Sequence, residues 1–367
     1  MPVSPWSSRL ERLRAAWAEQ ADVCVISSLV NIAYLTGQHA SAGLLVQSSD
    51  QTWLLLDGRY TTSAREAAAE GRLADVLIEE VSAGFDEALT QVLGQLTVGR
   101  VTFESEHVTV AQLQKWQARI SAEWIPAAPL VEPLRLIKDH SEIEVLTRAG
   151  RLLSSVADQL ATWVRPGRRE REIAADIDRA LVTAGFSKPA FDTIVASGPN
   201  SALPHARPGA RMLGEGDLVV LDFGGVLEGY CVDLTRMAAV GRVAPEAHAL
   251  YDAVRQAHGA ALAAVAAGVS ARDVDAAARH VLEAQGLGDA FVHGTGHGLG
   301  LEVHEAPRVS RLVPPEQRLE AGMVCTIEPG AYVPGLGGAR LEDDVVVTDR
   351  GAQLLTTTSR DLLILHL

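Results

Sequence analysis

Cysteine is scarce in this chain of 367 residues, which contains Cys24, Cys231 and Cys325 and no CxxC pair. An odd, sparse set of cysteines excludes a disulfide-stapled scaffold and is typical of proteins that fold in a reducing compartment. The N-terminal segment also lacks the apolar stretch of a secretory signal peptide. We therefore expect a cytoplasmic protein.

Positive charge and long hydrophobic runs are also in short supply. Lysine and arginine number 32 against 46 aspartates and glutamates, which gives a formal net charge of −14. Nucleic acid and anionic membrane surfaces do not attract an acidic protein, so we expect neither as a partner. The longest alanine-rich run, AALAAVAAGV, has ten residues and is too short to cross a bilayer.

The length predicts two domains, because single hydrophobic cores stop growing at about 250–300 residues. The segment IPAAPLVEPLRLIK, which contains three prolines, is the best linker candidate. We place a first domain over residues 1–133 and a second over 134–367. The first domain alternates strand-like and helix-like segments, with a hairpin that turns at residues 48–51.

The second domain contains a weak internal repeat, in which residues 168–185 match residues 269–286. Each copy has helical periodicity and ends in a glycine, as helices often do. A longer helical segment precedes each copy, at residues 140–163 and 245–266, and an apolar, strand-like region follows. We therefore expect an α+β domain made of two helix–helix–hairpin units that face each other.

Each of these two hairpins carries a pair of acidic residues. Asp222 and Asp233 flank a Gly-rich turn, which suggests that they lie opposite each other across two strands. Glu328 and Glu342 are placed symmetrically about Gly335 in the second hairpin. Four buried carboxylates that meet need compensating charge, since a lone buried carboxylate costs several kcal/mol. Two divalent cations would supply it.

Histidines are concentrated in the stretch HGTGHGLGLEVHEAPR, residues 293–308. The stretch matches neither the HExxH zinc helix nor the GxGxxG dinucleotide loop. Glycines on both sides of His297 permit close approach of a ligand or substrate. One imidazole added to four carboxylates suits a two-metal site, and oxygen-rich ligation favours Mn²⁺ or a similar ion over a structural zinc.

These motifs resemble those of the pita-bread metallopeptidases, which include methionine aminopeptidases, Xaa-Pro aminopeptidases, prolidases and the metal-free creatinases. The resemblance lies in LDFGGVLEGYCVDLTR, HGTGHGLGLEVHE, TIEPG and RLEDD, in the family's order. The segments NIAYLTG and DGRYTTSAREA resemble the creatinase-type N-terminal domain that Xaa-Pro peptidases carry and methionine aminopeptidases lack. The resemblance implies a smaller α/β creatinase-like domain followed by a pita-bread catalytic domain.

The resemblance also implies a set of five metal ligands. Asp222 would bind one divalent ion, and His297 with Glu328 would bind the other. Asp233 and Glu342 would bridge both ions. Because all five positions are filled, a creatinase or a metal-free binding relative is disfavoured. Mn²⁺ is the expected ion, with Co²⁺ or Zn²⁺ as alternatives.

The implied reaction is hydrolysis of the Xaa-Pro imide bond by a hydroxide between the two ions, which releases the N-terminal residue. Glu328 would also move the proton, and His304 would stabilise the tetrahedral oxyanion. His205 occupies the position of the family's substrate-side histidine. His293 would orient the substrate or the ligands, and Arg340 would hold carboxylates or contact the substrate.

Arg308 favours Xaa-Pro dipeptides, because in prolidases an arginine at this position is associated with the substrate's C-terminal carboxylate. Only a dipeptide has a free carboxylate directly after proline. An Xaa-Pro aminopeptidase that acts on longer peptides is the nearest alternative, and a non-catalytic pita-bread binding module is a more distant one. The resemblance also implies a homodimer.

Overall fold

The computed structural model describes residues 5–127 and 129–365, and the chain divides into two compact units between Arg135 and Leu136. The proline-rich segment that we expected to be a linker contains regular secondary structure. Strand β6 (Glu123–Ala127) and helix α6 (Glu132–Arg135) occupy half of it. Residue 128, inside this segment, lies outside the described residues.

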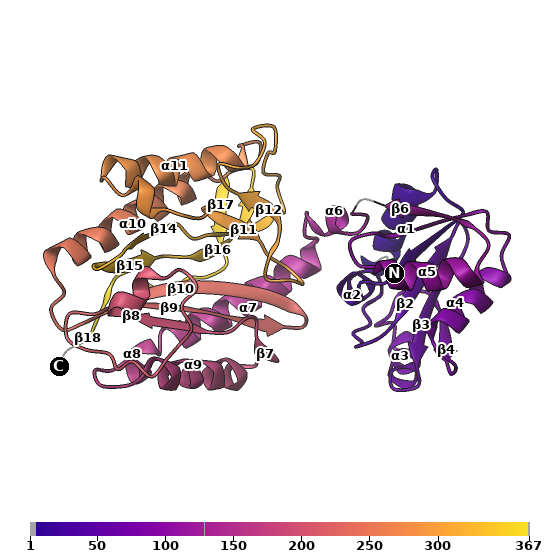
Figure 1. The fold of residues 1–367 in the computed structure, drawn as a ribbon, viewed down its shortest axis with the longest axis horizontal. Coiled ribbons are helices and arrows are strands. Elements are labelled where there is room, and N and C mark those ends of the chain that lie inside the picture. The colour runs from indigo at the N-terminus through magenta and orange to yellow at the C-terminus, as the bar shows by residue number, and fades with distance from the viewer. Residues whose placement is uncertain (1–4, 128, 366–367) are drawn as a thin grey trace. The chain divides into compact units, whose positions relative to one another are not determined.

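Unit 1 is built on a mixed six-stranded sheet with the order β4-β3-β2-β1-β5-β6 (Figure 1). The expected hairpin at residues 48–51 joins β2 to β3 and is confirmed. Besides β6 and α6, the unit contains α1 (Pro5–Trp17), β1 (Val23–Ile26), α2 (Leu29–Thr36), β2 (Leu44–Ser48), β3 (Thr52–Asp57), α3 (Thr61–Ala69), β4 (Leu77–Val81), α4 (Phe85–Gly94), β5 (Arg100–Glu104) and α5 (Val110–Arg119).

Helix α2 was not predicted from the sequence. Its eight residues, LVNIAYLT, include few polar side chains and show no clear apolar face, because six of them are buried. The ends are well defined: the Ser28 side chain accepts from the backbone N–H of Asn31, and Gly37 ends the helix with a φ of 82°. The surrounding core therefore specifies this helix together with its caps.

Unit 2 has the expected duplicated arrangement. The first copy contains α7 (His140–Ala157), α8 (Leu160–Trp163), α9 (Glu170–Ala184), β7 (Lys188–Pro189), β8 (Ile194–Ser197), the 3₁₀ helix η1 (Gly198–Ala202), β9 (Leu218–Leu227) and β10 (Tyr230–Val240). The second copy contains α10 (Pro245–Ala264), α11 (Ala271–Ala284), the 3₁₀ helix η2 (Gly288–Ala290), β11 (Gly296–Gly298), β12 (Glu305–Val309), β13 (Val324–Ile327), β14 (Gly330–Val333), β15 (Gly337–Arg340), β16 (Asp343–Thr348), β17 (Gly351–Leu354) and β18 (Leu363–Leu365).

The strands of unit 2 lie between two helical layers, with α10 and α11 on one side and α7, α8 and α9 on the other (Figure 1). One sheet has the order β18-β10-β9-β7, with β8 also paired to β9, and another has the order β12-β11-β13-β16-β17. The repeat explains the helices: Ile173 and Val274 are both fully buried, as are Leu181 and Leu282. Each copy packs its helices on its own hairpin, which brings the two hairpins together at the centre of the unit.

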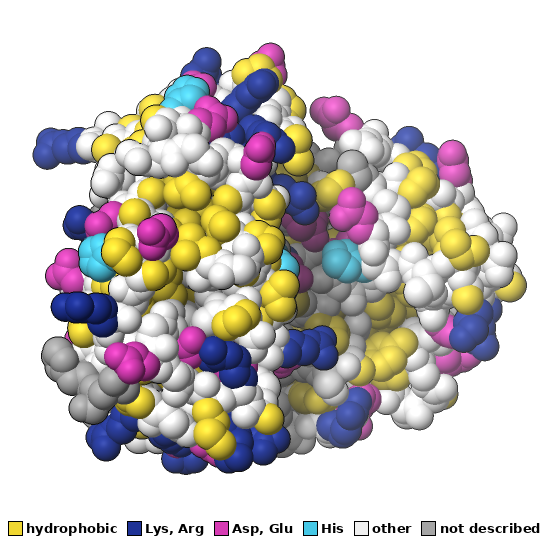
Figure 2. All heavy atoms as spheres, turned by 60° about the vertical axis from the view of Figure 1, so that its left-hand side comes forward, with side chains coloured by type: hydrophobic (Ala, Val, Ile, Leu, Met, Phe, Trp, Pro, Cys, Tyr) yellow, Lys and Arg dark blue, Asp and Glu magenta, His cyan; other side chains and the backbone are white. Residues whose placement is uncertain are grey.

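Figure 2 shows the types of side chain on one face of the molecule. On the face drawn in Figure 2, acidic and basic side chains are interspersed among hydrophobic and neutral ones. Within the described residues, no helix has both the length and the apolar character that a membrane span requires.

Candidate metal centre

The first two acidic residues lie on the hairpin of β9 and β10, and both are buried. Asp222 pairs with Thr235 and Asp233 pairs with Gly224, so the carboxylates are diagonal neighbours and not directly opposite, as we had expected. The expectation was wrong because the hairpin turns one residue later, at Glu228, which has a φ of 50°. Since side chains alternate along a strand, this shift of two positions keeps both carboxylates on one face.

The other two acidic residues flank a break in the second hairpin. Glu328 follows β13 and Glu342 precedes β16, and the separate β14–β15 ribbon begins beyond them. Pro329 has no N–H, which explains why the ladder stops here. The ladders on both sides of the break share one register, which places Glu328 opposite Glu342. The backbone N–H of Glu342 instead donates to Thr235 on β10 at 3.3 Å, which joins the two hairpins.

His297 is the central residue of β11. Its two neighbours must be glycines, because a Cβ at Gly296 or Gly298 would collide with a backbone carbonyl oxygen of an adjacent segment. The ring Nδ1 donates to the carbonyl oxygen of Gly298 at 3.0 Å, which leaves the lone pair on Nε2. This Nε2 lies 3.5 Å from Oε1 of Glu328.

The structure brings these side chains into one buried group. Ligand atoms of Asp233, His297 and Glu342 all lie within 4.8 Å of one another. One oxygen each of Asp222, Asp233 and Glu342 is buried and has no hydrogen-bond partner within the described ranges. A buried carboxylate oxygen without a donor is costly, and a bound cation removes that cost. The donors, mostly carboxylate oxygens with one imidazole, therefore fit divalent cations.

Burial and mutual repulsion shift the pKa values of the group. The pKa of Asp233 lies well above its usual value, first because of burial and then because of the charges on Glu342 and Asp222. Burial, followed by the charges on Glu328 and Asp222, does the same for Glu342. Burial also raises the pKa of Glu328 and lowers that of His297. Without cations, Asp233, Glu328 and Glu342 therefore retain protons at a higher pH than ordinary carboxyls do, and the His297 imidazole is neutral.

We predict that metal-free protein loses stability as the pH rises above about 5. Unfolded carboxyls titrate near pH 4, so above that pH the unfolded chain releases protons that Asp233 and Glu342 retain in the folded state. The free energy of unfolding then falls by up to about 1.4 kcal/mol per group and pH unit until the raised pKa is passed. Thermal melting after chelation, repeated with Mn²⁺ restored, tests this: a slope that persists with the metal would contradict it.

Arg340 lies beneath the carboxylates and is itself buried. Its Nη2 donates to Asp222 in a buried ion pair, and its Nε donates to the hydroxyl of Thr235 at 3.2 Å. Its Nη1 donates to the hydroxyl of Tyr332 at 2.6 Å and to the carbonyl oxygen of Pro204 at 3.2 Å. These bonds hold the Arg340 guanidinium against Asp222, Thr235 and Tyr332.

Thr235 is part of the site, and we did not predict it from the sequence. Its hydroxyl donates to Oε2 of Glu342 at 2.7 Å and accepts from Arg340. The signal was present in the motif CVDLTR, because alternation along a strand puts Thr235 on the same face as Asp233. This hydroxyl fixes one oxygen of Glu342 and leaves the other for a cation.

Tyr332, on β14, was also missed. Burial raises its pKa to about 12, so it remains a neutral phenol. Its hydroxyl lies 3.0 Å from Nε2 of His293, whose Nδ1 donates to the carbonyl oxygen of Gly294 at 2.7 Å. The phenol is therefore the donor in its bond to His293. Both ring nitrogens of His293 are engaged, which leaves only the face or edge of its ring for a substrate.

The remaining candidates are exposed beside the carboxylates. The ring centroids of His304 and His297 are 4.3 Å apart. Burial lowers the pKa of His304, with the charges of His297 and His205 as further causes, so His205 faces the same space. Arg308 pairs with His297 in the β11–β12 ladder. Within the described residues, the Arg308 guanidinium makes no hydrogen bond or ion pair, which leaves it free for an anionic group of a ligand.

The cysteines near the site are packing residues. Cys231 and Cys325 are buried and unpaired, and burial raises the pKa of each to about 12. A thiol with so high a pKa is not a nucleophile at neutral pH.

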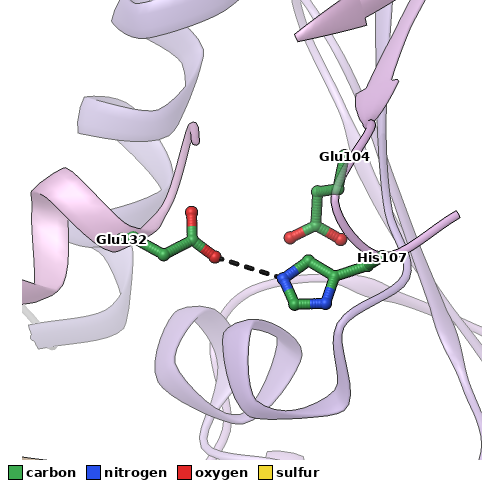
Figure 3. A group of neighbouring side chains, drawn as sticks. All are labelled: Glu104, His107 and Glu132. Carbon is green, nitrogen blue, oxygen red and sulfur yellow. Dashed lines mark hydrogen bonds and ion pairs between the residues drawn. The ribbon is translucent and has the colours of Figure 1, made fainter. Parts of the chain in front are cut away.

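Unit 1 contains a second group of possible metal ligands, which Figure 3 shows: Glu104, His107 and Glu132. Hydrogen bonds already account for this group. The side-chain amide of Asn31 donates to one oxygen of each glutamate at 2.6 Å, and the backbone N–H of Ser28 donates to the other oxygen of Glu104 at 2.8 Å. His107 lies 3.4 Å from Glu132. The amide bridges the two carboxylates and relieves their repulsion, so we assign Glu104 to capping of α2.

Comparison with known proteins shows which family the sequence matches. The sequence matches "Metallopeptidase family M24" over residues 144–349 and "Creatinase/Prolidase N-terminal domain" over residues 9–137. It is 35% identical to an Xaa-Pro dipeptidase of Pyrococcus furiosus, over 97% of this chain and 99% of that protein. An Xaa-Pro dipeptidase structure from Bacillus anthracis superimposes with a TM-score of 0.94 at 33% identity, over 98% of this chain and 100% of the other. An X-Pro aminopeptidase structure from Thermotoga maritima gives 0.88 at 32% identity, over 97% and 99%.

Proposed function

Since the chain belongs to metallopeptidase family M24, with a creatinase/prolidase-type domain before a pita-bread catalytic domain, we propose that it hydrolyses the Xaa-Pro bond of dipeptides. The observation that carries the dipeptide preference is the position of Arg308. This uncommitted guanidinium lies across the ladder from His297, at the edge of a carboxylate group suited to cations. The Cβ atoms of directly opposed residues in a ladder lie about 5 Å apart, a distance comparable to the length of a dipeptide.

The residues that would hold two divalent ions are Asp222, Asp233, His297, Glu328 and Glu342. They fit because three of their buried oxygens have no hydrogen-bond donor in the described structure, and because Nε2 of His297 carries the free lone pair. The bound ions would lower the pKa of a water and polarise the scissile carbonyl. Mn²⁺ is the proposed metal, since oxygen donors predominate, with Co²⁺ or Zn²⁺ as alternatives.

The chain's own residues then have separate tasks. Glu328, whose pKa is raised by burial, accepts a proton from the attacking water and delivers it to the proline nitrogen, which cannot leave as an anion. His304 is neutral because burial lowers its pKa, so its ring N–H can donate to the developing oxyanion. His205 faces the same space and would orient the substrate. Arg340 and Tyr332 keep Asp222 and His293 in place.

The test is peptide length. Ala-Pro should be cleaved by the Mn²⁺-loaded protein, whereas Ala-Pro-Ala should be cleaved at least about tenfold less efficiently, because its carboxylate lies one residue beyond the reach of Arg308. Strong cleavage of the tripeptide would instead favour an Xaa-Pro aminopeptidase, the function that the similarity to the Thermotoga maritima structure supports. Fewer than about one ion per chain and no cleavage of either peptide would favour a non-catalytic module.

We predict that Arg308→Ala raises the KM for Ala-Pro about tenfold and leaves its kcat within about threefold. A surface ion pair with a flexible substrate contributes about 1–2 kcal/mol, and its loss affects ground state and transition state alike. Initial rates over a range of Ala-Pro concentrations measure this. Arg311→Ala, a neighbouring exposed position, is the matched control, and an unchanged KM for R308A would remove Arg308 from substrate recognition.

We also propose a cytoplasmic homodimer that binds neither nucleic acid nor membranes. The unpaired, buried cysteines support a reducing compartment, and the net charge of −14 opposes binding to anionic polymers and surfaces. The homodimer is proposed from the family resemblance.

A further inference from the structure

We infer that a buried ion pair between Lys138 and Glu305 positions His304, which makes both of them positioning residues of the reaction. The inference rests on the proposed function, since it concerns how the segment 300–308, with His304 and Arg308, is held at the site. Lys138 Nζ lies 3.3 Å from Oε2 of Glu305, and the two residues are 167 positions apart in the chain.

Glu305 is directly bonded to His304 in the chain, but its surroundings are different. The His304 residue is exposed, whereas the Glu305 side chain is only 8% exposed. Strand β12 begins at Glu305, directly after the bend that carries His304, so a fixed Glu305 side chain fixes the backbone from which His304 projects. The buried Glu305 carboxylate thus holds in place the backbone of His304, the residue proposed to face the substrate.

The backbone before His304 closes around this carboxylate. Oε1 of Glu305 accepts from the backbone N–H of Glu302 at 3.0 Å. A Cβ at Gly300 would lie 2.9–3.1 Å from the carboxylate atoms of Glu305, so the turn leaves no space for a side chain there. The carbonyl oxygen of Gly300 accepts from Cys231 on β10 at 2.6 Å, which ties the turn to the first hairpin.

Lys138 supplies the charge that keeps the carboxylate inside. Its ammonium side chain is 1% exposed, and lysine is almost never so deeply buried unless it is paired. Its backbone is fixed as well, because its N–H donates to Gly322 at 2.9 Å and the preceding Ile137 bridges to Met323. Without the ammonium group, the buried Glu305 carboxylate would lose an ion-pair partner, and removal of one partner of a buried pair is strongly destabilising. The carboxylate would then turn to solvent and take the backbone of His304 with it.

Steady-state kinetics of Lys138→Met on Ala-Pro give the first test. We expect kcat to fall about 10–100-fold, with KM within about threefold and two ions per chain retained, because the ligands themselves are not touched. Lys138→Arg should recover most of the kcat, since it keeps the charge. The control is Arg168→Met, which breaks the half-buried Arg168–Asp176 pair of the same unit and should leave kcat unchanged. A K138M protein with normal kcat per folded chain overturns the inference.

A double-mutant cycle gives the second test. If Lys138 acts through His304, adding K138M to His304→Ala should cause no further loss of kcat, whereas independent effects would multiply and overturn the inference. If K138M does not fold, the neutral pair K138M/E305L carries the same comparison, because replacing both partners of a buried ion pair is usually tolerated.

An NMR measurement separates this inference from the proposed function. The imidazole resonance of His304, identified by its loss in H304A, should shift in K138M and stay in place in R168M. This result does not depend on any peptide being cleaved. An unchanged resonance overturns the inference even in an active enzyme, while a shifted resonance in a protein that cleaves no Xaa-Pro substrate overturns only the proposed function.

Discussion

Replacing Glu342 by glutamine is expected to abolish Xaa-Pro hydrolysis and, at the same time, to raise the melting temperature of the metal-free protein. Glu342 is 2% exposed, one of its oxygens has no donor in the described structure, and burial with two neighbouring negative charges raises its pKa. The amide has the same shape without the charge. A cation that bridges through Glu342 would lose a ligand, so kcat/KM should fall at least about 10³-fold, equivalent to several kcal/mol of transition-state stabilisation.

The loss of the carboxylate charge, which weakens cation binding, is also what stabilises the metal-free protein. Without cations, Glu342 must either take up a proton when the chain folds at neutral pH or bear a buried charge beside Glu328 and Asp222, and a neutral amide incurs neither cost. Each kcal/mol gained raises the melting temperature by about 2–4 °C in a unit of this size. Differential scanning calorimetry of chelated protein and elemental analysis of loaded protein measure both effects. Glu144→Gln, on the exposed face of α7, is the control and should change neither. A fully active E342Q would remove Glu342 from the metal centre.

Replacing His304 by alanine is expected to lower kcat about 10²–10³-fold with little change in KM. A donor aimed at the developing oxyanion acts in the transition state and not on the bound substrate, so kcat and kcat/KM should fall together. Because the His304 residue is exposed and its ring lies tilted against that of the proposed ligand His297 without being a ligand itself, two ions per chain should remain.

Steady-state rates with Ala-Pro and the metal content of the same preparation test this. His280→Ala, on the exposed side of α11, is the matched control and should retain full activity. A raised KM with an unchanged kcat would show that His304 contributes to ground-state binding, and loss of metal would show that it takes part in ligation.

Much of the site could be predicted because its signals are local. The acidic pairs stand symmetrically about glycine-rich turns, and a hairpin turns such spacing into proximity. Even here the register depends on a single residue: the turn at Glu228 moved Asp222 from a position opposite Asp233 to a diagonal one. The carboxylates still share a face because the displacement is an even number of residues.

The residues that support the ligands could not be predicted in the same way. Tyr332 reaches His293 across 39 positions, and Arg340 reaches Asp222 across 118. Neither pair leaves a periodic pattern in the sequence. The motif of Arg340 indicates that it either holds carboxylates or contacts substrate, and only the structure shows its bonds to Asp222, Thr235 and Tyr332.

The sequence by itself determined the chemistry of this protein: an acidic, cysteine-poor chain, a duplicated unit, four carboxylates on two hairpins and one imidazole between glycines. Residue types, their spacing and strand or helix periodicity suffice for these features because they depend on neighbours within a few residues along the chain. The tertiary structure alone decided the hydrogen bonds that hold the ligands, the break at Pro329 and the pairing of Lys138 with Glu305. These depend on burial, which gives a polar contact its strength and is a property of the packed molecule, not of any segment.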